Sequence, residues 1–206
     1  MATLPHTQRL AQQLEFIVVV DRLKQVLRQT SLIDGSRREN SAEHSWHLAT
    51  MALVLAEYVP AEVDLLRVLK MLLVHDIIEI EAGDTFAFDV AANLDKAARE
   101  QLAADLLFGM LPPDLQSDLQ SLWIEFERNT TVEAQFANAL DRLQPLLHNY
   151  HNQGGTWRRH GITRQQVLQR MRPIQTGAPQ LWPFVLSVID ESCAAGYIRP
   201  DPEADF

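Results

Sequence analysis

The sequence has almost no cysteine. Cys193 is the only one among 206 residues, so an internal disulfide is excluded and a reducing compartment is expected. The longest apolar stretches, residues 16–20 and 71–74, are far too short to cross a bilayer, which needs about 20 residues. Residues 1–9 also lack the basic segment and apolar core of a secretory signal. We therefore expect a cytoplasmic protein with no membrane partner.

Positive charge is scarce as well. Lysine and arginine together number 18 against 27 acidic residues, which gives a formal net charge of −9. Binding to a nucleic-acid polymer needs a basic surface, so such a partner is not expected. A small anionic substrate remains compatible with this balance if a few cations gather at one place.

Period-two alternation of apolar residues is absent, whereas apolar residues recur at helical spacing. The sequence therefore predicts an all-α fold. The expected helices span residues 7–30, 41–58, 63–80, 91–110, 114–128, 131–150, 163–171 and 179–194. Asn40 and Glu43 have the spacing of a capping box at the start of the second helix, and Gly83 is expected to close the third. Residues 154–161 are expected to form a glycine-rich loop.

His75, Asp76 and Glu79 lie inside the apolar run of residues 63–80, which is predicted to be a buried helix. Ionised side chains are unfavourable in an apolar interior unless they are paired, so such a cluster indicates mutual pairing or a shared metal ion. At about 100° of rotation per residue, Glu79 falls between His75 and Asp76 around the helix. All three therefore face one side, where a single ion can bind.

Two more residues complete a candidate set of metal ligands. His44 lies in the first turn of the second expected helix, and Asp141 lies among apolar residues of a later one. Helical proteins build metal sites from inward side chains on facing helices. The sequence therefore predicts one divalent ion held by His44, His75, Asp76 and Asp141. Two imidazoles and two carboxylates suit Mn, Co, Fe, Zn or Mg, and the lack of nearby cysteine argues against structural zinc.

This order of residues resembles the signature of the HD-domain phosphohydrolase superfamily, which is a His, then a His-Asp pair, then a distant Asp. Residues 38–45 (RENSAEHS), residues 75–79 (HDIIE) and Gly83-Asp84 are similar to the branch of HD-domain 5′-deoxynucleotidases. The resemblance covers about residues 10–150. It implies a single HD domain over residues 1–206, with a helical extension at 151–206, that acts as a homodimer and removes phosphate from deoxyribonucleoside 5′-monophosphates.

The resemblance also implies roles for residues around the metal. Glu79 would orient or deprotonate the attacking water, and Asp84 would contact the sugar or support the site. Arg28 matches a phosphate-binding arginine of the family, and Arg37 is a second candidate for binding the substrate. Such an ion lowers the pKa of bound water and polarises the phosphoryl oxygen, while a guanidinium pairs with phosphate oxygens.

Several of these residues also have a purely structural interpretation. Glu79 can pair with a neighbouring arginine, Asp84 can cap a turn, and Arg37 can be a solvated loop charge. His47 and His148 lie one and two turns from expected ligands, so either can approach the ion. Histidines in such positions more often support the core or the ligands.

Alternatives to the expected activity stay open as well. Another phosphate ester or a cyclic nucleotide fits the same site chemistry. A non-catalytic nucleotide-sensing domain that keeps the metal for stability is a different class, which the presence of Glu79 disfavours. The family often has an aromatic residue directly after the arginine at Arg28, whereas Gln29 stands there, so the sugar preference is left open.

Overall fold

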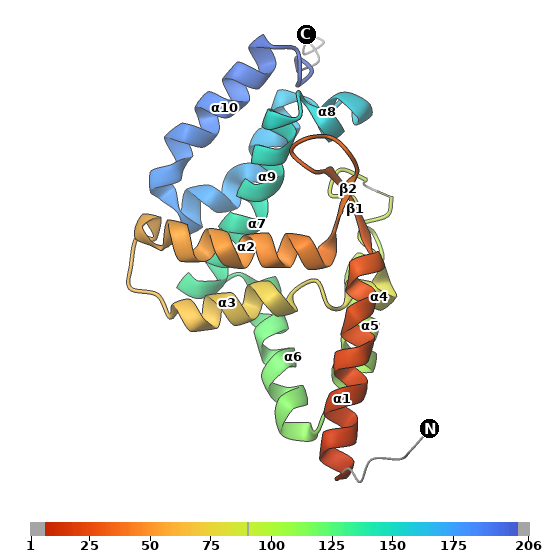
Figure 1. Cartoon of the computed structure of the whole chain (residues 1–206). Coiled ribbons are helices and arrows are strands. Elements are labelled where there is room, and N and C mark those ends of the chain that lie inside the picture. Colours follow the sequence, from red (N-terminus) through yellow and green to blue (C-terminus); the bar gives the residue numbers. More distant parts are fainter. Residues whose placement is uncertain (1–6, 90, 202–206) are drawn as a thin grey trace.

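A computed structural model describes residues 7–89 and 91–201 of the chain. The predicted all-α fold is confirmed, with the addition of one short hairpin (Figure 1). The α-helices are α1 (Gln8–Val20), α2 (Ser41–Leu55), α3 (Leu65–Val74), α4 (Glu79–Ala82), α5 (Lys96–Phe108), α6 (Pro113–Arg128), α7 (Val132–His151), α8 (Gly155–His160), α9 (Arg164–Gly177) and α10 (Trp182–Ala194). The 3₁₀ turns are η1 (Asp21–Gln25), η2 (Ala56–Tyr58) and η3 (Pro179–Leu181), and the strands are β1 (Leu27–Ser31) and β2 (Arg38–Asn40).

Helices α2 and α3 lie side by side across the middle of the molecule, and both pack on α7 (Figure 1). Helix α9 packs along α7 more extensively than any other pair of elements, and α10 packs on α9. Helices α1 and α6 extend towards one end and α8 and α10 towards the other. No helix of the described ranges is long and apolar enough to cross a membrane.

Helix α3 joins two clusters of buried apolar side chains. Its residues Val68 and Leu72 belong to the larger cluster, which includes side chains of α2, α7, α9 and α10. Val74 belongs to the smaller cluster, which α1, α5 and α6 complete. Because His75 and Asp76 directly follow Val74, they lie where the two clusters meet.

The predicted capping box at the start of α2 is confirmed. The Asn40 side chain accepts from the Glu43 backbone N–H at 2.9 Å, and the Glu43 carboxylate accepts from the Asn40 N–H at 2.8 Å. These bonds satisfy backbone donors that have no partner inside the helix. The cap therefore fixes where α2 begins and so aims its first turn.

The expectation of one helix over residues 7–30 is wrong in its second half. Helix α1 ends at Val20, a 3₁₀ turn follows, and residues 27–31 form β1, which pairs antiparallel with β2. The connection turns at Gly35, which has a φ of 70°. Burial along β1 does not alternate, so the strand carries no period-two signal.

The expected helix over residues 63–80 is interrupted. Helix α3 ends at Val74 with His75 as its C-cap, and α4 begins at Glu79. Between them the N–H groups of Ile77 and Glu79 donate to the carbonyls three residues earlier, at 3.1 Å and 3.0 Å. In such a tight turn, side chains three positions apart are eclipsed. The interruption changes the relative placement of Asp76 and Glu79 from that of a regular helix, but both still line one cavity together with His75.

Residues 154–161, expected as a loop, contain the short helix α8 between two glycines with positive φ, Gly154 (92°) and Gly161 (63°). The helix expected over residues 163–171 is also longer than predicted, because α9 continues through an internal proline, Pro173, to Gly177. Helix α7 likewise contains a proline, Pro145. A proline inside a helix removes one backbone hydrogen bond without necessarily ending the helix.

Candidate metal centre

His75 presents one free ring nitrogen to the centre of the molecule. Its Nδ1 donates to the Leu72 carbonyl at 2.9 Å, so Nε2 carries the lone pair. Nε2 is buried and has no hydrogen-bond partner among the described residues. It lies 4.0 Å from Oδ1 of Asp141 on α7. A backbone carbonyl that fixes the tautomer in this way is the usual arrangement of a metal-ligating histidine.

His44 meets Asp141 from the first turn of α2. It is fully buried, and its Nε2 lies 3.0 Å from Asp141 Oδ1. Burial and the charge of Arg28 act to lower the pKa of His44, but its contacts with Asp141 and Glu39 outweigh them and raise it to about 9. The two carboxylates therefore favour a positive charge at this imidazole.

Donor atoms of His44, His75 and Asp141 all lie within 4.8 Å of one another. Asp76 adds a fourth group, with Oδ1 at 3.1 Å from His75 Nε2 and Oδ2 at 4.0 Å from His44 Nε2. The structure thus brings together the four predicted ligands from α2, α7 and the turn after α3. Two imidazoles and two carboxylates with an unpartnered Nε2 fit a borderline or hard divalent ion.

Arg28 reaches the same centre from β1. Its Nη1 donates to Asp76 Oδ2 at 2.9 Å, and its Nη2 lies 4.0 Å from Asp141 Oδ1. Burial acts to lower the pKa of Arg28, but the charges of Asp76 and Glu79 outweigh it and raise the pKa. The hairpin, which the sequence did not reveal, is therefore the element that carries this arginine to the site.

Glu79 and Asp84 both line the cavity beside the ligands. Glu79 accepts from the Ser41 hydroxyl at 2.7 Å. Burial, and next the charge of Asp76, raise the pKa of Glu79 well above its ordinary value. Burial also raises the pKa of Asp84. Burial therefore favours the protonated form of both carboxyl groups more than water does, which is typical of groups that take part in proton transfer.

Arg37 is not brought to the centre. Its side chain is 54% exposed and forms two bonds to the Glu43 carboxylate, at 2.5 Å and 2.8 Å. It does not line the cavity. Its position instead supports the structural interpretation, because it holds the capping residue of α2.

A cavity of about 360 Å³ opens beside the four ligands. Besides Arg28, it is lined by three cations and by aromatic side chains from several segments. The cations are Lys96, Arg142 and Arg170, and the aromatic residues are Phe86, Phe88, Phe126 and Trp157. The cavity also has six carboxylates in its lining, which are Asp76, Glu79, Asp84, Glu100, Glu127 and Asp141. It therefore combines cations, carboxylates and flat apolar surface.

Arg170 differs from Lys96 and Arg142, the other two cavity cations that sequence reasoning missed. Arg142 pairs with Asp141 and Lys96 with Glu100, whereas no carboxylate of the described ranges forms an ion pair with Arg170. Burial, and next the charge of Arg142, lower the pKa of Arg170 to about 9. It remains charged at neutral pH, and an anion entering the cavity would satisfy it.

A family model described as HD domain matches residues 20–182 of the chain. The match extends past Tyr150 into the C-terminal helices, and so includes α9. The chain is 33% identical to 5′-deoxynucleotidase HDDC2 of Bos taurus over 136 residues and 31% identical to the Homo sapiens protein over 135 residues. Each alignment covers 65% of this chain but only 64% and 65% of the relatives' own length.

Among solved structures, the chain is similar to a protein of Magnetospirillum magnetotacticum MS-1 described as a predicted metal-dependent phosphohydrolase. The two are 52% identical with a TM-score of 0.89, over 94% of this chain and 100% of that one. A protein of Pyrococcus horikoshii OT3 matches at 25% identity with a TM-score of 0.63, over 86% and 98% of the two chains. The helical bundle and the helices after residue 150 are thus part of a shared architecture.

Proposed function

The chain belongs to the HD domain family, and we propose that it is a metal-dependent phosphohydrolase that removes the phosphate from ribo- or deoxyribonucleoside 5′-monophosphates. The observation that carries the proposal is the convergence of donor atoms of His44, His75 and Asp141 within 4.8 Å, beside a cavity whose lining includes four cations. The names of the relatives support a nucleotide substrate. The short distances between the donor atoms support a bound metal ion, and the cations of the cavity support a substrate with an anionic group such as phosphate.

In this proposal the ligands are His44, His75, Asp76 and Asp141. The donor set fits one divalent ion of the Mn, Co, Fe, Zn or Mg group. When bound, such an ion would lower the pKa of a water molecule and polarise a phosphoryl oxygen. The protein's own task at this point is to orient the ligands, and the Leu72 carbonyl does so for His75.

Glu79 is the proposed general base. It lines the cavity and has only the Ser41 hydroxyl as its side-chain hydrogen-bond partner among the described residues. A carboxylate whose pKa is raised towards neutrality can take a proton from an attacking water. Ser41 orients the carboxylate, and its position is set by the α2 cap.

Arg170 and Arg28 are the proposed phosphate-binding residues. A planar guanidinium binds phosphate oxygens through paired, charge-assisted hydrogen bonds. Arg170 has no competing ion pair within the described ranges. Arg28 is held by Asp76, and so is fixed close to the reacting group. Arg37, which is bound to Glu43 away from the cavity, is not included.

The nucleoside is proposed to lie against Phe86, Phe88 and Trp157. Phe86 and Phe88 contact each other edge to face, with ring centroids 5.5 Å apart, and Trp157 lines the same cavity. Flat aromatic surfaces stack on bases with little selectivity for sequence. Asp84, on the loop just before these phenylalanines, is proposed to contact the sugar.

A test of the phosphate-binding proposal is Arg170→Met. The substitution removes the charge and keeps an apolar chain in place, so we expect KM to rise by about 10- to 100-fold, which corresponds to loss of one charge-assisted hydrogen bond. Steady-state kinetics with a nucleoside monophosphate measure the change. Arg172→Met on the exposed side of the same helix is the matched control, and an equal rise in both variants would reject the role.

The activity itself is tested by phosphate release. Purified protein is treated with a chelator, then assayed on ribo- and deoxyribonucleoside 5′-monophosphates, 3′-monophosphates and cyclic nucleotides with added Mn²⁺, Co²⁺, Mg²⁺ or Zn²⁺. We expect no turnover after chelation and recovery with one of the ions, with 5′-monophosphates preferred. Activity restricted to diesters, or unaffected by chelation, would contradict the proposal.

A homodimer in the cytoplasm is the proposed state of the molecule. Four exposed apolar side chains of α1 support the dimer, because they form one face of that helix: Leu10, Leu14, Ile17 and Val18. An apolar stripe of this kind is more typical of an interface than of free surface. The cytoplasmic location stays a prediction from the cysteine content.

A further inference from the structure

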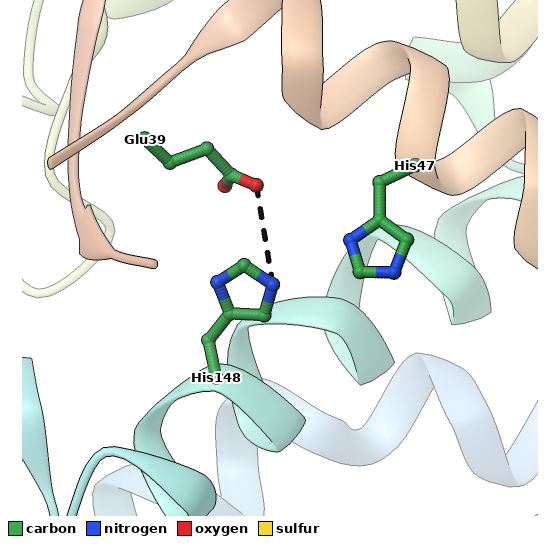
Figure 2. A group of neighbouring side chains, drawn as sticks. All are labelled: Glu39, His47 and His148. Carbon is green, nitrogen blue, oxygen red and sulfur yellow. Dashed lines mark ion pairs between the residues drawn. The ribbon is translucent and has the colours of Figure 1, made fainter. Parts of the chain in front are cut away.

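A second group of side chains of the types that bind metals lies next to the first centre, and Glu39 lies between the two groups. Glu39 of β2, His47 of α2 and His148 of α7 point towards one another from three elements (Figure 2). One donor atom of each lies within 4.8 Å of the others. Glu39 and His148 are buried and His47 is half-buried. None of the three belongs to the four-residue centre already described.

His148 is oriented as a ligand. Its Nδ1 donates to the Ser31 carbonyl at 3.0 Å, which leaves the lone pair on Nε2. That Nε2 faces the group and lies 4.0 Å from Glu39 Oε1, along the dashed line of Figure 2. His75 is held in the same way by the Leu72 carbonyl. Burial is the largest cause that lowers the pKa of His47, and it favours the neutral imidazole that a metal ligand requires.

The amide of Gln144 lies at the centre of the group. Its Nε2 is 2.5 Å from Glu39 Oε1, 3.0 Å from His148 Nε2 and 3.4 Å from His47 Nδ1. An amide nitrogen has two hydrogens, so it cannot satisfy three acceptors. Gln144 is fully buried, yet its Oε1 has no hydrogen-bond partner among the described residues. A buried acceptor without a partner is unfavourable.

A cation would satisfy all of these acceptors at once. If the Gln144 amide turns by 180°, its Oε1 joins the carboxylate and the two imidazole nitrogens, and four acceptors then face one point. We propose that Glu39, His47, Gln144 and His148 bind a second divalent cation, separate from the catalytic ion. Two nitrogen and two oxygen donors favour Zn²⁺ over a hard ion such as Mg²⁺.

Glu39 connects this second site to the first. While its Oε1 faces His148, its Oε2 lies 3.5 Å from Nδ1 of His44, a proposed catalytic ligand. A carboxylate behind a ligating histidine tunes the basicity of that ligand. Cation binding at Oε1 draws negative charge away from His44, so the occupancy of the second site changes the affinity of the first. The alternative is a hydrogen-bond network without a metal ion, in which Gln144 acts only as a donor to Glu39 and the two histidines.

The experiment counts Zn²⁺ bound to the full chain by equilibrium dialysis and elemental analysis. We expect two equivalents for the wild type, and one for His47→Ala, whose second equivalent binds at least tenfold more weakly. His75→Ala is expected to lose the other equivalent and keep this one. The matched control is His151→Ala, an exposed histidine of the same helix as His148, which should keep both.

A second measurement leaves all four ligands intact. The ring centroids of Trp46 and His47 lie 6.1 Å apart, and Trp46 is 65% exposed. Co²⁺ bound by His47 should quench the fluorescence of Trp46, and this quenching should vanish in Trp46→Phe while the stoichiometry stays at two. One equivalent in the wild type, lost with His75→Ala but kept by His47→Ala, would overturn the second site and leave the catalytic centre standing.

Discussion

Glu79→Gln is expected to lower kcat by about 10²- to 10⁴-fold, the usual contribution of a positioned general base. The amide has the same shape and still accepts from Ser41, which donates at 2.7 Å, so the turn and the fold should be retained. What it loses is the capacity to take a proton from water. KM should change little, because the phosphate is bound by the arginines.

The metal content of the Glu79→Gln preparation shows whether activity is lost because the general base is missing or because the metal ion is no longer bound. Glu79 is not one of the converging ligands, so the variant should bind the ion as the wild type does. Glu81→Gln is the matched control, since Glu81 is two positions away and pairs with Arg22 at 2.8 Å outside the cavity. Full activity of Glu79→Gln would rule out its assigned role, whereas loss of activity together with the metal would make it a ligand.

Gly177→Ala is expected to lower the free energy of unfolding by about 3 kcal/mol, at the upper end of overpacking effects. An added Cβ would lie 2.0 Å from the Gln135 carbonyl oxygen and 3.0 Å from the Ala139 Cβ. The obstructing oxygen belongs to the backbone of α7, so it cannot move aside like a flexible side chain. Helices α7 and α9 would have to separate, and Asp141 and Arg170 would separate with them.

Urea unfolding of Gly177→Ala and Gly35→Ala measures this effect against a control. Gly35 has a φ of 70° but nothing within 4 Å of the added Cβ, so its substitution carries only backbone strain of about 1–2 kcal/mol. Comparison of the two variants thus distinguishes destabilisation by steric overlap, at Gly177, from destabilisation by an unfavourable backbone conformation, at Gly35. Equal losses in both variants would show that α7 and α9 are not as closely packed as described.

The sequence predicted those parts of the fold whose cause is local. The capping box of Asn40 and Glu43 depends on residues three apart, and the structure contains both of its hydrogen bonds. The apolar repeats of α2 and α7 likewise depend on near neighbours. The ligand motif could be recognised because ionisable groups seldom lie among apolar residues unless they pair with one another or bind an ion.

Elements that depend on distant partners were not predictable in this way. Strand β1 exists because residues 38–40 pair with it, and nothing within residues 27–31 indicates that pairing. The interruption after Val74 is also non-local, since the tight turn is held by the burial of Ile77 and Ile78 in the second cluster. Helical periodicity continues smoothly through both places.

Two groups of polar residues that sequence reasoning did not assign to a site are nevertheless indicated by the sequence. Val167, Arg170, Met171 and Ile174 have the spacing of an inward stripe, and the three apolar members are buried. An arginine at such a position indicates an internal anion or acid. On α7, Gln144 and His148 continue the inward face of Asp141 in the same manner. Glu39 left no such trace, because its place in the hairpin could not be foreseen.

The prolines inside α7 and α9 remove backbone hydrogen bonds from two helices that line the cavity. Pro145 and Pro173 both line it, and because proline has no amide hydrogen, the carbonyls of Asp141 and Gln169 lack their regular helical donor. Each of the two helices therefore lacks one backbone hydrogen bond next to the cavity. The backbone around the cavity is thus held by fewer hydrogen bonds along these two helices than regular helices of the same length would have.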